Sequence, residues 1–358
     1  MNEMTSETGQ TVLWKVDRNR PDPEIIRQAG LILRRGGLVA FPTETVYGLG
    51  ASALDGAAVE SIFKAKGRPQ DNPLIVHIAD EGMVDLYCSQ VPAKGKALMR
   101  KFWPGPLTLI LPGNGKISPR VSCGLETLAF RVPDHPVALE LIRSAGVPVA
   151  APSANISGRP SPTTADHVYS DLHGRIDALL DGGEAGLGVE STVLDITGEV
   201  PVILRPGGVT LDQILAVVGE VELDPSLTGT GGDPVSPRSP GMKYRHYAPT
   251  APLVLVEGDQ SRVVEEIKRM AVDYVERGKK VGVLCRADNC HQYPGALAIP
   301  AGAAGDQASV AAGLYQALRR FEGSGVDVIL AEGVDPGGLG LAVANRLRRA
   351  SGGAIIKV

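Results

Sequence analysis

The sequence predicts an α/β protein with two domains, for three reasons. The chain has 358 residues, and globular domains usually contain about 100–200 residues. Up to about residue 210, segments typical of strands mix with helical segments without strict alternation, which favours a mixed α/β or α+β domain. From residue 251 onward strands and helices alternate, as in a small doubly wound domain. We therefore expect a domain over 11–210, a linker over 211–250 and a second domain over 251–358.

The elements of the first domain follow from apolar spacing and from Gly and Pro punctuation. The apolar residues of 23–35 recur at helical spacing, and Gly36-Gly37 would end this helix. Further helices are predicted at 58–66 and 135–146. Strands are predicted at 38–43, 73–78, 107–112, 128–133 and 147–153, and 191–196 with 201–207 should form a hairpin pair.

The linker and the second domain differ in composition. Residues 219–250 contain little apolar sequence and many Gly and Pro residues, which indicates a linker. Its segment SPGMKYRHYAP (239–249) is dense in basic and aromatic residues, which a passive linker does not need. In the second domain, strands are predicted at 253–258, 279–285, 326–333 and 354–358, with helices at 261–278, 307–322 and 339–352.

The charge balance and the chain start limit the functional class. The chain carries 36 Lys and Arg against 40 Asp and Glu, a net charge of −4 spread evenly along its length. A dedicated nucleic-acid-binding protein usually has a basic excess, so only a local basic patch remains open. No run approaches the roughly 18 apolar residues of a membrane helix. The polar start MNEMTSETGQ resembles neither a secretory nor a transit signal, and we expect a cytoplasmic protein without membrane contact.

Several familiar site motifs are missing from the sequence. GxxxxGKS/T, HExxH and GxSxG do not occur, and the glycines of Gly48-Leu49-Gly50 and of 337–340 are interpreted as turn residues. The four cysteines form no CxxC pair. Cys285, Cys290 and His291 lie close together, but free thiols in a reducing compartment are the simpler interpretation.

Polar clusters at strand ends carry the functional signal. They occur at 41–50, 66–73, 151–162, 188–192 and 204–207, and Arg131 lies inside an apolar strand. Each has an ordinary explanation, such as a capped turn, a helix-terminal cation or, for His77, a core histidine. Together they supply Lys, Arg, Ser, Thr and Asn side chains without an obvious nucleophile. This inventory suits nucleotidyl transfer, where positioning and charge neutralisation do the catalysis.

These segments closely resemble the threonylcarbamoyl-AMP synthase family in its long, two-domain form. The resemblance is carried by FPTETVYGLG, KGRP, PLIVHI, FWPGPLT, FRVPDHP, APSANISG, GVESTVLD, LRPGG and SPGMKYRHYAP. The family signature K-x-R…S-x-N is met by Lys66, Arg68, Ser153 and Asn155. The match spans about residues 11–250, and the last part of the chain fits by position and pattern. The resemblance implies a YrdC-like twisted mixed sheet with an open cleft, followed by a smaller Rossmann-like parallel α/β domain.

The resemblance also implies the reaction and its partners. The family condenses L-threonine, bicarbonate and ATP into threonylcarbamoyl-AMP and releases pyrophosphate, with Mg²⁺ accompanying ATP. A tRNA threonylcarbamoyl transferase complex then uses the product for tRNA modification, and a weak tRNA contact by this chain is left open. Two other readings are a non-catalytic tRNA- or rRNA-binding protein, and carbamoyl transfer in hydrogenase maturation. Near-neutral charge disfavours the first, and the lack of CxxC pairs disfavours the second.

Residue roles are carried over position by position. Lys66 and Arg68 would be catalytic, because they would neutralise charge developing on the phosphates. The threonine site would consist of Thr45, His77, Arg131, Ala151 and Ser191. The ATP site would consist of Lys66, Arg68, Asn72, Thr127, Ser153, Asn155, Ser161, Arg205 and Tyr244, whereas metal ligands are not implied. In addition, Lys243, Tyr244, Arg245 and Tyr247 are expected to form a lid over the nucleotide.

Overall fold

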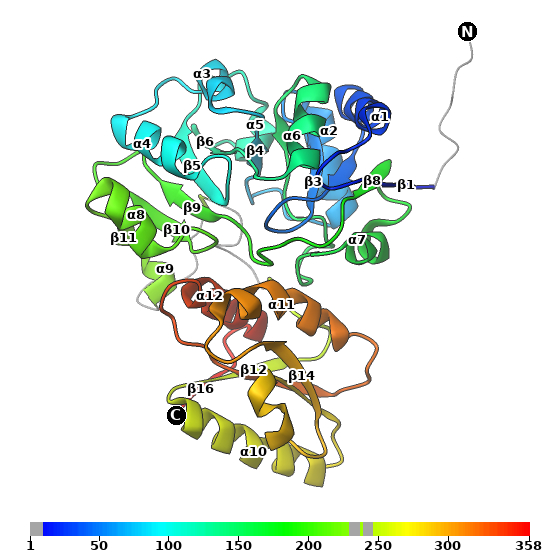
Figure 1. Cartoon of the computed structure of the whole chain (residues 1–358), viewed down its shortest axis with the longest axis vertical. Helices are drawn as coiled ribbons and strands as arrows, with labels where there is room; N and C mark the ends of the chain where they lie inside the picture. The colour runs from blue at the N-terminus through cyan, green and yellow to red at the C-terminus, as the bar shows by residue number, and fades with distance from the viewer. Residues whose placement is uncertain (1–9, 229–236, 239–245) are drawn as a thin grey trace.

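The computed structural model of the chain describes residues 10–228, 237–238 and 246–358, and it contains two sheets (Figure 1). One sheet has eleven strands and the other has five. The predicted two-part α/β architecture, with a mixed sheet followed by a smaller parallel sheet, is thus confirmed. Within the described residues, no helix combines the length and the apolar character needed to cross a membrane.

The large sheet is mixed and twisted. In spatial order its strands are β1 (Val12–Lys15), β8 (Ala178–Asp181), β2 (Val39–Phe41), β3 (Gly48–Ser52), β7 (Val149–Ala150), β4 (Ile75–His77), β6 (Thr127–Arg131), β5 (Leu107–Pro112), β9 (Thr192–Asp195), β10 (Val202–Arg205) and β11 (Glu222–Leu223). β4 and β6 are parallel and place His77 opposite Arg131. β9 and β10 form the predicted antiparallel pair.

Helices cover this sheet and bring polar residues to its strand ends. They are α1 (Pro23–Arg34), α2 (Gly56–Lys66), α3 (Val84–Tyr87), α4 (Ala93–Phe102), α5 (Pro119–Ser122), α6 (Pro136–Ala145), α7 (Ala165–Leu172), α8 (Leu211–Val218) and α9 (Pro225–Thr228), with a 3₁₀ turn at Glu81–Met83. Asp55 caps the start of α2 through the amides of Ala57 and Ala58. Gly67 ends this helix at φ +60°, a conformation that favours glycine. Lys66 is therefore the last helical residue before a sharp change of direction.

Two expectations differ from the structure in this part of the chain. Gly48-Leu49-Gly50 was predicted as a turn, but it lies in β3, which pairs with β2; a Cβ at Gly50 would lie 2.8 Å from side-chain atoms of both Phe41 and Val149, so glycine is needed there. The expected linker over 211–250 begins with α8, which has a capping box between Thr210 and Gln213. β11 then pairs with β10, so the large sheet continues past residue 210.

The small domain is a five-stranded parallel sheet. Its order is β14 (Leu297–Gly302), β13 (Val281–Arg286), β15 (Val328–Glu332), β12 (Leu253–Glu257) and β16 (Ile355–Lys357). Its helices are α10 (Gln260–Glu276), α11 (Gln307–Arg320) and α12 (Gly340–Ser351), with a 3₁₀ segment at Ala287–Gln292. α11 and α12 lie on the side that faces the large domain, and α10 lies on the opposite face (Figure 1).

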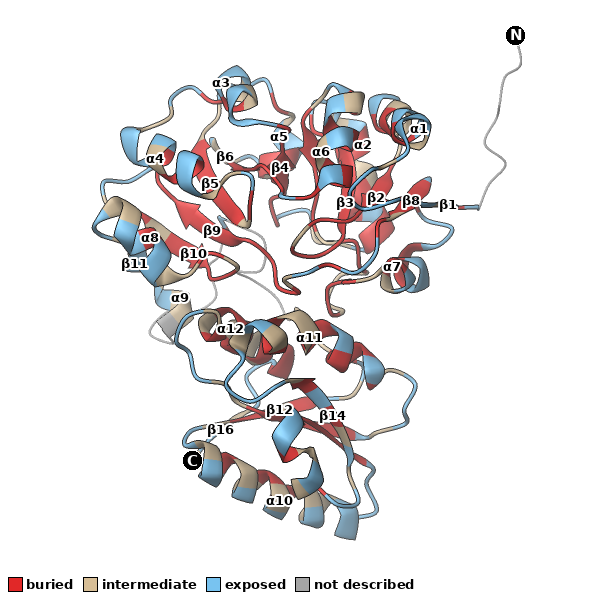
Figure 2. Ribbon diagram, viewed as in Figure 1, coloured by how far each residue is buried: buried red, intermediate tan, exposed pale blue. Residues whose placement is uncertain are grey.

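The two domains share a buried interface. The central strands of both sheets are buried, whereas the edge strands β1, β11, β14 and β16 and the outer helix faces are partly exposed (Figure 2). Val46, Val189 and Tyr247 belong to the same apolar cluster as Leu314 and Tyr315 of α11. Gly188 has φ +77°, and a Cβ there would lie 2.4 Å from the carbonyl oxygen of Ala311. The backbones of the two domains therefore meet without an intervening side chain at this point.

Candidate active site

One polar cavity collects residues from the ends of several strands of the large sheet. It is lined by Thr43, Thr45, Val46, Tyr47, Gly48, Lys66, Arg68, Ile75, His77, Arg131, Ala151, Pro152, Ser153, Asn155, Ser157, Gly158, Arg159, Glu190, Ser191, Arg205, His246 and Tyr247. Most of the residues predicted for the threonine and ATP sites are therefore in one wall. The free volume of the cavity is about 60 Å³, whereas pockets that enclose drug-sized ligands measure about 300–1,000 Å³.

The K-x-R…S-x-N signature forms a contact between α2 and the loop after β7. Lys66 is buried, and its Nζ donates hydrogen bonds to the carbonyl oxygens of Ser153 and Asn155 at 2.5 Å. Ser153 Oγ donates to Asn155 Oδ1, and Asn155 Nδ2 donates to the carbonyl oxygens of Ile156 and Arg159. Burial and the neighbouring charge of Arg68 hold the pKa of Lys66 well below its usual value. An anion bound here would favour the charged ammonium.

Arg68 follows the αL residue Gly67 and turns back toward its own loop. Its guanidinium donates to the carbonyl oxygens of Asn72 and Pro73 at 3.1–3.2 Å. Burial lowers the pKa of Arg68 to about 10. The side chain remains a cation at neutral pH, close to the ammonium of Lys66.

The parallel pairing of β4 and β6 builds the other end of the cavity. Arg131 is buried; its Nη2 donates to Thr45 Oγ1 at 3.0 Å and lies 2.7 Å from Glu44 Oε2. His77 is buried beside it, with Nδ1 3.3 Å from the carbonyl oxygen of Ile75. Burial, and secondarily the charge of Arg131, lower the pKa of His77 to about 3. His77 is therefore neutral at physiological pH.

Ser191 and Arg205 complete this end of the site. Ser191 is fully buried, and its Oγ lies 2.7 Å from Thr108 Oγ1. Arg205 Nη2 donates to the carbonyl oxygen of Ser191 at 2.8 Å and to its Oγ at 3.1 Å. Burial lowers the pKa of Arg205. The antiparallel β9–β10 pair thus places a hydroxyl and a guanidinium side by side.

Three of the predicted ATP-site residues, Asn72, Thr127 and Ser161, do not line the described cavity wall. Among the described residues, neither side-chain polar atom of the buried Asn72 has a hydrogen-bond partner, and Thr127 begins β6 at the opposite end from Arg131. Ser161 lies one contact behind the wall, where its Oγ donates to Glu190. Tyr244 lies outside the described residues, as do Lys243 and Arg245 of the expected lid. Tyr247, the remaining lid residue, lines the cavity.

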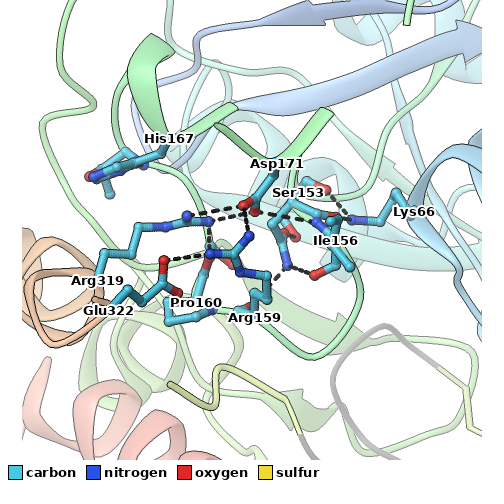
Figure 3. A network of polar contacts seen from close by, with 12 residues as sticks. Lys66, Ser153, Ile156, Arg159, Pro160, His167, Asp171, Arg319 and Glu322 are labelled. Carbon is cyan, nitrogen blue, oxygen red and sulfur yellow. Dashed lines mark hydrogen bonds and ion pairs between the residues drawn. The ribbon is translucent and has the colours of Figure 1, made fainter. Parts of the chain in front are cut away.

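Sequence reasoning missed Glu190 and Asp171, two carboxylates that organise the wall. Glu190 precedes Ser191 and is the wall carboxylate; its charge is stabilised by Arg346 and Arg205, which hold its pKa at about 2 although burial opposes this. Asp171, on α7, accepts hydrogen bonds from Arg319 and from the amide of Ile156, and it also pairs with Arg159 (Figure 3). An acid directly beside a predicted site serine was the available signal for Glu190. Nothing local marks Asp171.

Known families match nearly the whole chain. Residues 31–207 match the Sua5, YciO and YrdC family, described as telomere recombination. Residues 209–352 match the family described as threonylcarbamoyl-AMP synthase, C-terminal domain.

Individual relatives agree with these matches. The threonylcarbamoyl-AMP synthase of Bacillus subtilis (strain 168) is 50% identical over 353 residues, which are 97% of this chain and 100% of that protein. A shorter relative from Mycobacterium tuberculosis (strain ATCC 25618 / H37Rv) is 38% identical over 203 residues, or 55% of this chain and 93% of its own length. The crystal structure of Pyrococcus abyssi Sua5 complexed with L-threonine superimposes with a TM-score of 0.92 at 48% identity, covering 97% of this chain and 100% of that one. The chain therefore belongs to the threonylcarbamoyl-AMP synthase family.

Proposed function

We propose that this chain condenses L-threonine, bicarbonate and ATP into threonylcarbamoyl-AMP and releases pyrophosphate. The observation that carries the proposal is the charge of the cavity wall, which holds five Lys and Arg side chains and a single carboxylate among its described residues. The two substrate groups to be held, an amino-acid carboxylate and a triphosphate, are both anions, and charge-assisted hydrogen bonds to guanidinium groups suit them. The related P. abyssi protein binds L-threonine.

Threonine would occupy the end of the cavity formed by β4 and β6. Arg131 would pair with the carboxylate, and Thr45, His77, Ala151 and Ser191 would surround the rest of the molecule. His77 has a pKa of about 3, so it would act as a neutral hydrogen-bonding group. A neutral imidazole places no second positive charge beside the Arg131 guanidinium.

The nucleotide would lie toward the end of α2. Lys66 and Arg68 would neutralise charge on the phosphates as pyrophosphate leaves. The other residues assigned to ATP are Asn72, Thr127, Ser153, Asn155, Ser161, Arg205 and Tyr244. The unpartnered amide of the buried Asn72 supports its assignment, because a buried polar group normally finds a partner.

The chemistry would need no protein nucleophile. The threonine amine would take up carbon dioxide derived from bicarbonate, losing a proton and forming a carbamate. A carbamate oxygen would attack the α-phosphorus of ATP, the bond to the β-phosphate oxygen would break, and pyrophosphate would leave. Dehydration of bicarbonate accounts for one water. The chain's contribution would be to align these groups and to exclude bulk water from a labile intermediate.

Mg²⁺ would arrive with ATP. In the described part of the chain, no group of three or more His, Cys, Asp or Glu side chains is placed to hold a metal ion. Mg²⁺ in nucleotide sites is usually held by substrate phosphates, waters and one or two carboxylates. Glu190 is the wall carboxylate, and its oxygens already accept hydrogen bonds from Ser161, Tyr315 and Arg346. The donor set therefore fits an ion carried mainly by the phosphates, where it would neutralise their charge.

Tyr247 and the segment before it would act as the lid. A cavity of about 60 Å³ has room for only a few water molecules, so a wall must move before a nucleotide can enter. Tyr247 is the candidate, because it joins the wall from the polypeptide between the two domains. The closed position would protect the carbamate once the substrates are inside.

The product would pass to a tRNA threonylcarbamoyl transferase complex, because an acyl-adenylate of this kind is an activated donor. The test of the function is pyrophosphate release from the purified chain with ATP and Mg²⁺, with threonine or bicarbonate omitted in turn. Release that requires both is expected. Release without threonine would indicate another acceptor, and ATP binding without release would favour the non-catalytic RNA-binding alternative.

A further inference from the structure

Two carboxylates of the large domain are held by buried arginines of the small domain. Arg346 of α12 is fully buried, and its Nε donates to Glu190 Oε2 at 2.7 Å. Arg319 of α11 is also buried, and its Nη2 donates to Asp171 Oδ2 at 2.8 Å. Removing one partner of a buried ion pair leaves an uncompensated charge, unlike the loss of an exposed pair. Each domain thus lacks counter-charges that the other supplies.

Glu190 connects α11 and α12 to predicted substrate residues. Its Oε1 accepts hydrogen bonds from Ser161 Oγ at 2.5 Å and from Tyr315 OH at 3.0 Å. Arg346 Nη1 also donates to the carbonyl oxygen of Pro206, next to Arg205, at 2.9 Å. A shift of α12 would therefore move both the residue that orients Ser161 and the loop that follows β10.

Asp171 connects α11 to the loop that holds Lys66 (Figure 3). Besides Arg319, Asp171 contacts Arg159 and accepts from the amide of Ile156 at 3.3 Å. Arg319 Nη2 donates to the carbonyl oxygen of Pro160 at 2.6 Å. Arg159 reaches further to Glu322, in the turn after α11, at 2.5 Å. The small domain thus contacts the loop 153–161 through Arg319 and Glu322. Carbonyl groups of this loop accept the hydrogen bonds of the Lys66 ammonium.

The small domain also supports the lid residue. The ring centroids of Tyr247 and Tyr315 lie 5.4 Å apart. The guanidinium carbon of Arg346 also lies 5.4 Å from the centroid of the Tyr247 ring. The following amide, of Ala248, donates to the carbonyl oxygen of Gly158 at 2.8 Å. One arginine therefore contacts both the wall carboxylate and the lid.

We propose that the small domain completes the active site, with Arg346 and Arg319 as positioning residues that act through Glu190 and Asp171. This inference rests on the proposed function. It predicts that these arginines set the catalytic rate rather than only the stability of the fold.

The main test compares Arg346→Met, Arg346→Lys, Glu190→Gln and the double variant Glu190→Gln/Arg346→Met in threonine-dependent pyrophosphate release. Arg346→Met should lower kcat at least 10-fold, and Arg346→Lys should recover part of the loss. The double variant leaves no unpaired carboxylate, so its unfolding temperature should return toward that of the wild type while kcat stays low. If Arg346→Met alone does not fold, the double variant still tests whether kcat depends on the Glu190–Arg346 pair. Arg348→Met on the same helix, where Arg348 pairs with the small-domain residue Glu257, is the matched control.

A pH profile separates positioning from stability. The charged and titratable groups that face Glu190 are Arg346, Arg205, Tyr315 and Tyr247. Loss of Arg346 removes the strongest cation, so Glu190 should take up a proton at higher pH. The variant should then lose kcat/KM on the acid side at a pH where the wild type retains it.

A second pair of variants tests the other arginine. Arg319→Met should lower kcat and raise the KM for ATP at least 5-fold, whereas Arg320→Met, which changes the exposed neighbour, should match the wild type. If the wild type releases no pyrophosphate, the proposed function fails. If the wild type is active but Arg346→Met and Arg319→Met keep its kcat and pH profile, or if the double variant regains full kcat, the arginines are only structural and the inference is overturned.

Discussion

Glu44 Oε2 lies 2.7 Å from Nη2 of Arg131, the guanidinium that we assign to the carboxylate of threonine. The side chain of Glu44 is 14% exposed and that of Arg131 is 5% exposed, so the pair is shielded from solvent. A carboxylate of the chain thus stands where a substrate carboxylate would bind. With this assignment, we expect threonine to compete with Glu44 for the Arg131 guanidinium.

This relationship predicts tighter threonine binding when Glu44 is neutralised. Glu44→Gln keeps the shape of the side chain and removes the competing charge. The KM for threonine should fall about 3- to 10-fold, which corresponds to about 1 kcal/mol, while the KM for ATP stays within about twofold. Initial rates of pyrophosphate release measure both constants. Glu140→Gln, which breaks an exposed pair with Arg143, is the control, and a higher threonine KM in Glu44→Gln would show that Glu44 helps to bind the substrate.

Replacement of Lys66 should affect chemistry far more than that of its neighbour. Lys66→Met removes the buried cation at the proposed phosphate site and should lower kcat about 100-fold or more, the usual loss for a group that stabilises transition-state charge. Lys64 is exposed and pairs with Glu60, so Lys64→Met should retain the wild-type rate. Calorimetric titration with ATP and with threonine should show weaker ATP binding and little change for threonine. Equal rates in both variants would remove Lys66 from the catalytic machinery.

The lid predicts a change in coupling as well as in affinity. Tyr247→Ala, and separately Tyr244→Ala with Arg245→Ala, should raise the KM for ATP about 10-fold. An open site should also let the carbamate decompose, so the amount of threonylcarbamoyl-AMP formed per ATP consumed should fall. Chromatography of the products gives this ratio. Tyr169→Ala, at an exposed tyrosine of α7, should leave it unchanged; unaltered kinetics in all lid variants would contradict the assignment.

Buried histidines predict a loss of stability in acid. Burial lowers the pKa of His135 and of His167 to about 4, and that of His77 to about 3. In the unfolded chain histidine titrates near 6.5, so between about pH 6.5 and 4 the unfolded state binds more protons. Stability is therefore full above about pH 6.5 and falls as pH decreases through this window.

His135 offers a direct measurement of this effect. It is 1% exposed, and neither ring nitrogen has a hydrogen-bond partner among the described residues. His135→Leu should reduce the loss of unfolding free energy between pH 7 and 5 by up to about 2 kcal/mol. Urea unfolding at the two pH values measures the difference. His173→Leu, at an exposed position, should keep the wild-type pH dependence, and the same dependence in His135→Leu would refute the prediction.

Many residues that line the described cavity could be predicted from the sequence, because their signals are local. Lys66, Arg68, Ser153 and Asn155 form a compact motif pair, and polar residues at strand ends gather wherever a sheet brings those ends together. The alternation after residue 251 likewise indicated a parallel sheet, because the strands predicted at 253–258 and 326–333 are each followed by an amphipathic helix. Even so, β14 was not predicted, since Pro300 interrupts its apolar pattern.

Other features depend on neighbours that are distant in the sequence. The glycines of β3 looked like turn residues because the crowding by Phe41 and Val149 appears only after folding. The pairing of Glu190 with Arg346 joins positions 156 residues apart. No spacing rule or local composition could reveal that contact, so the contacts of the small domain with the cavity could not be predicted from the sequence.

The close approach at Gly188 has a consequence for inheritance. Any other residue there would push a Cβ into the backbone of α11, and the adjoining segment needs arginines encoded more than a hundred codons downstream. We therefore expect that exchanging one half of the gene for a divergent copy would mismatch the domain interface formed by Gly188, Glu190, Asp171, Arg319 and Arg346. We expect both domains of long relatives to descend from the same ancestral gene. Hybrid proteins made from divergent parents should fold or function poorly unless the interface residues come from one parent.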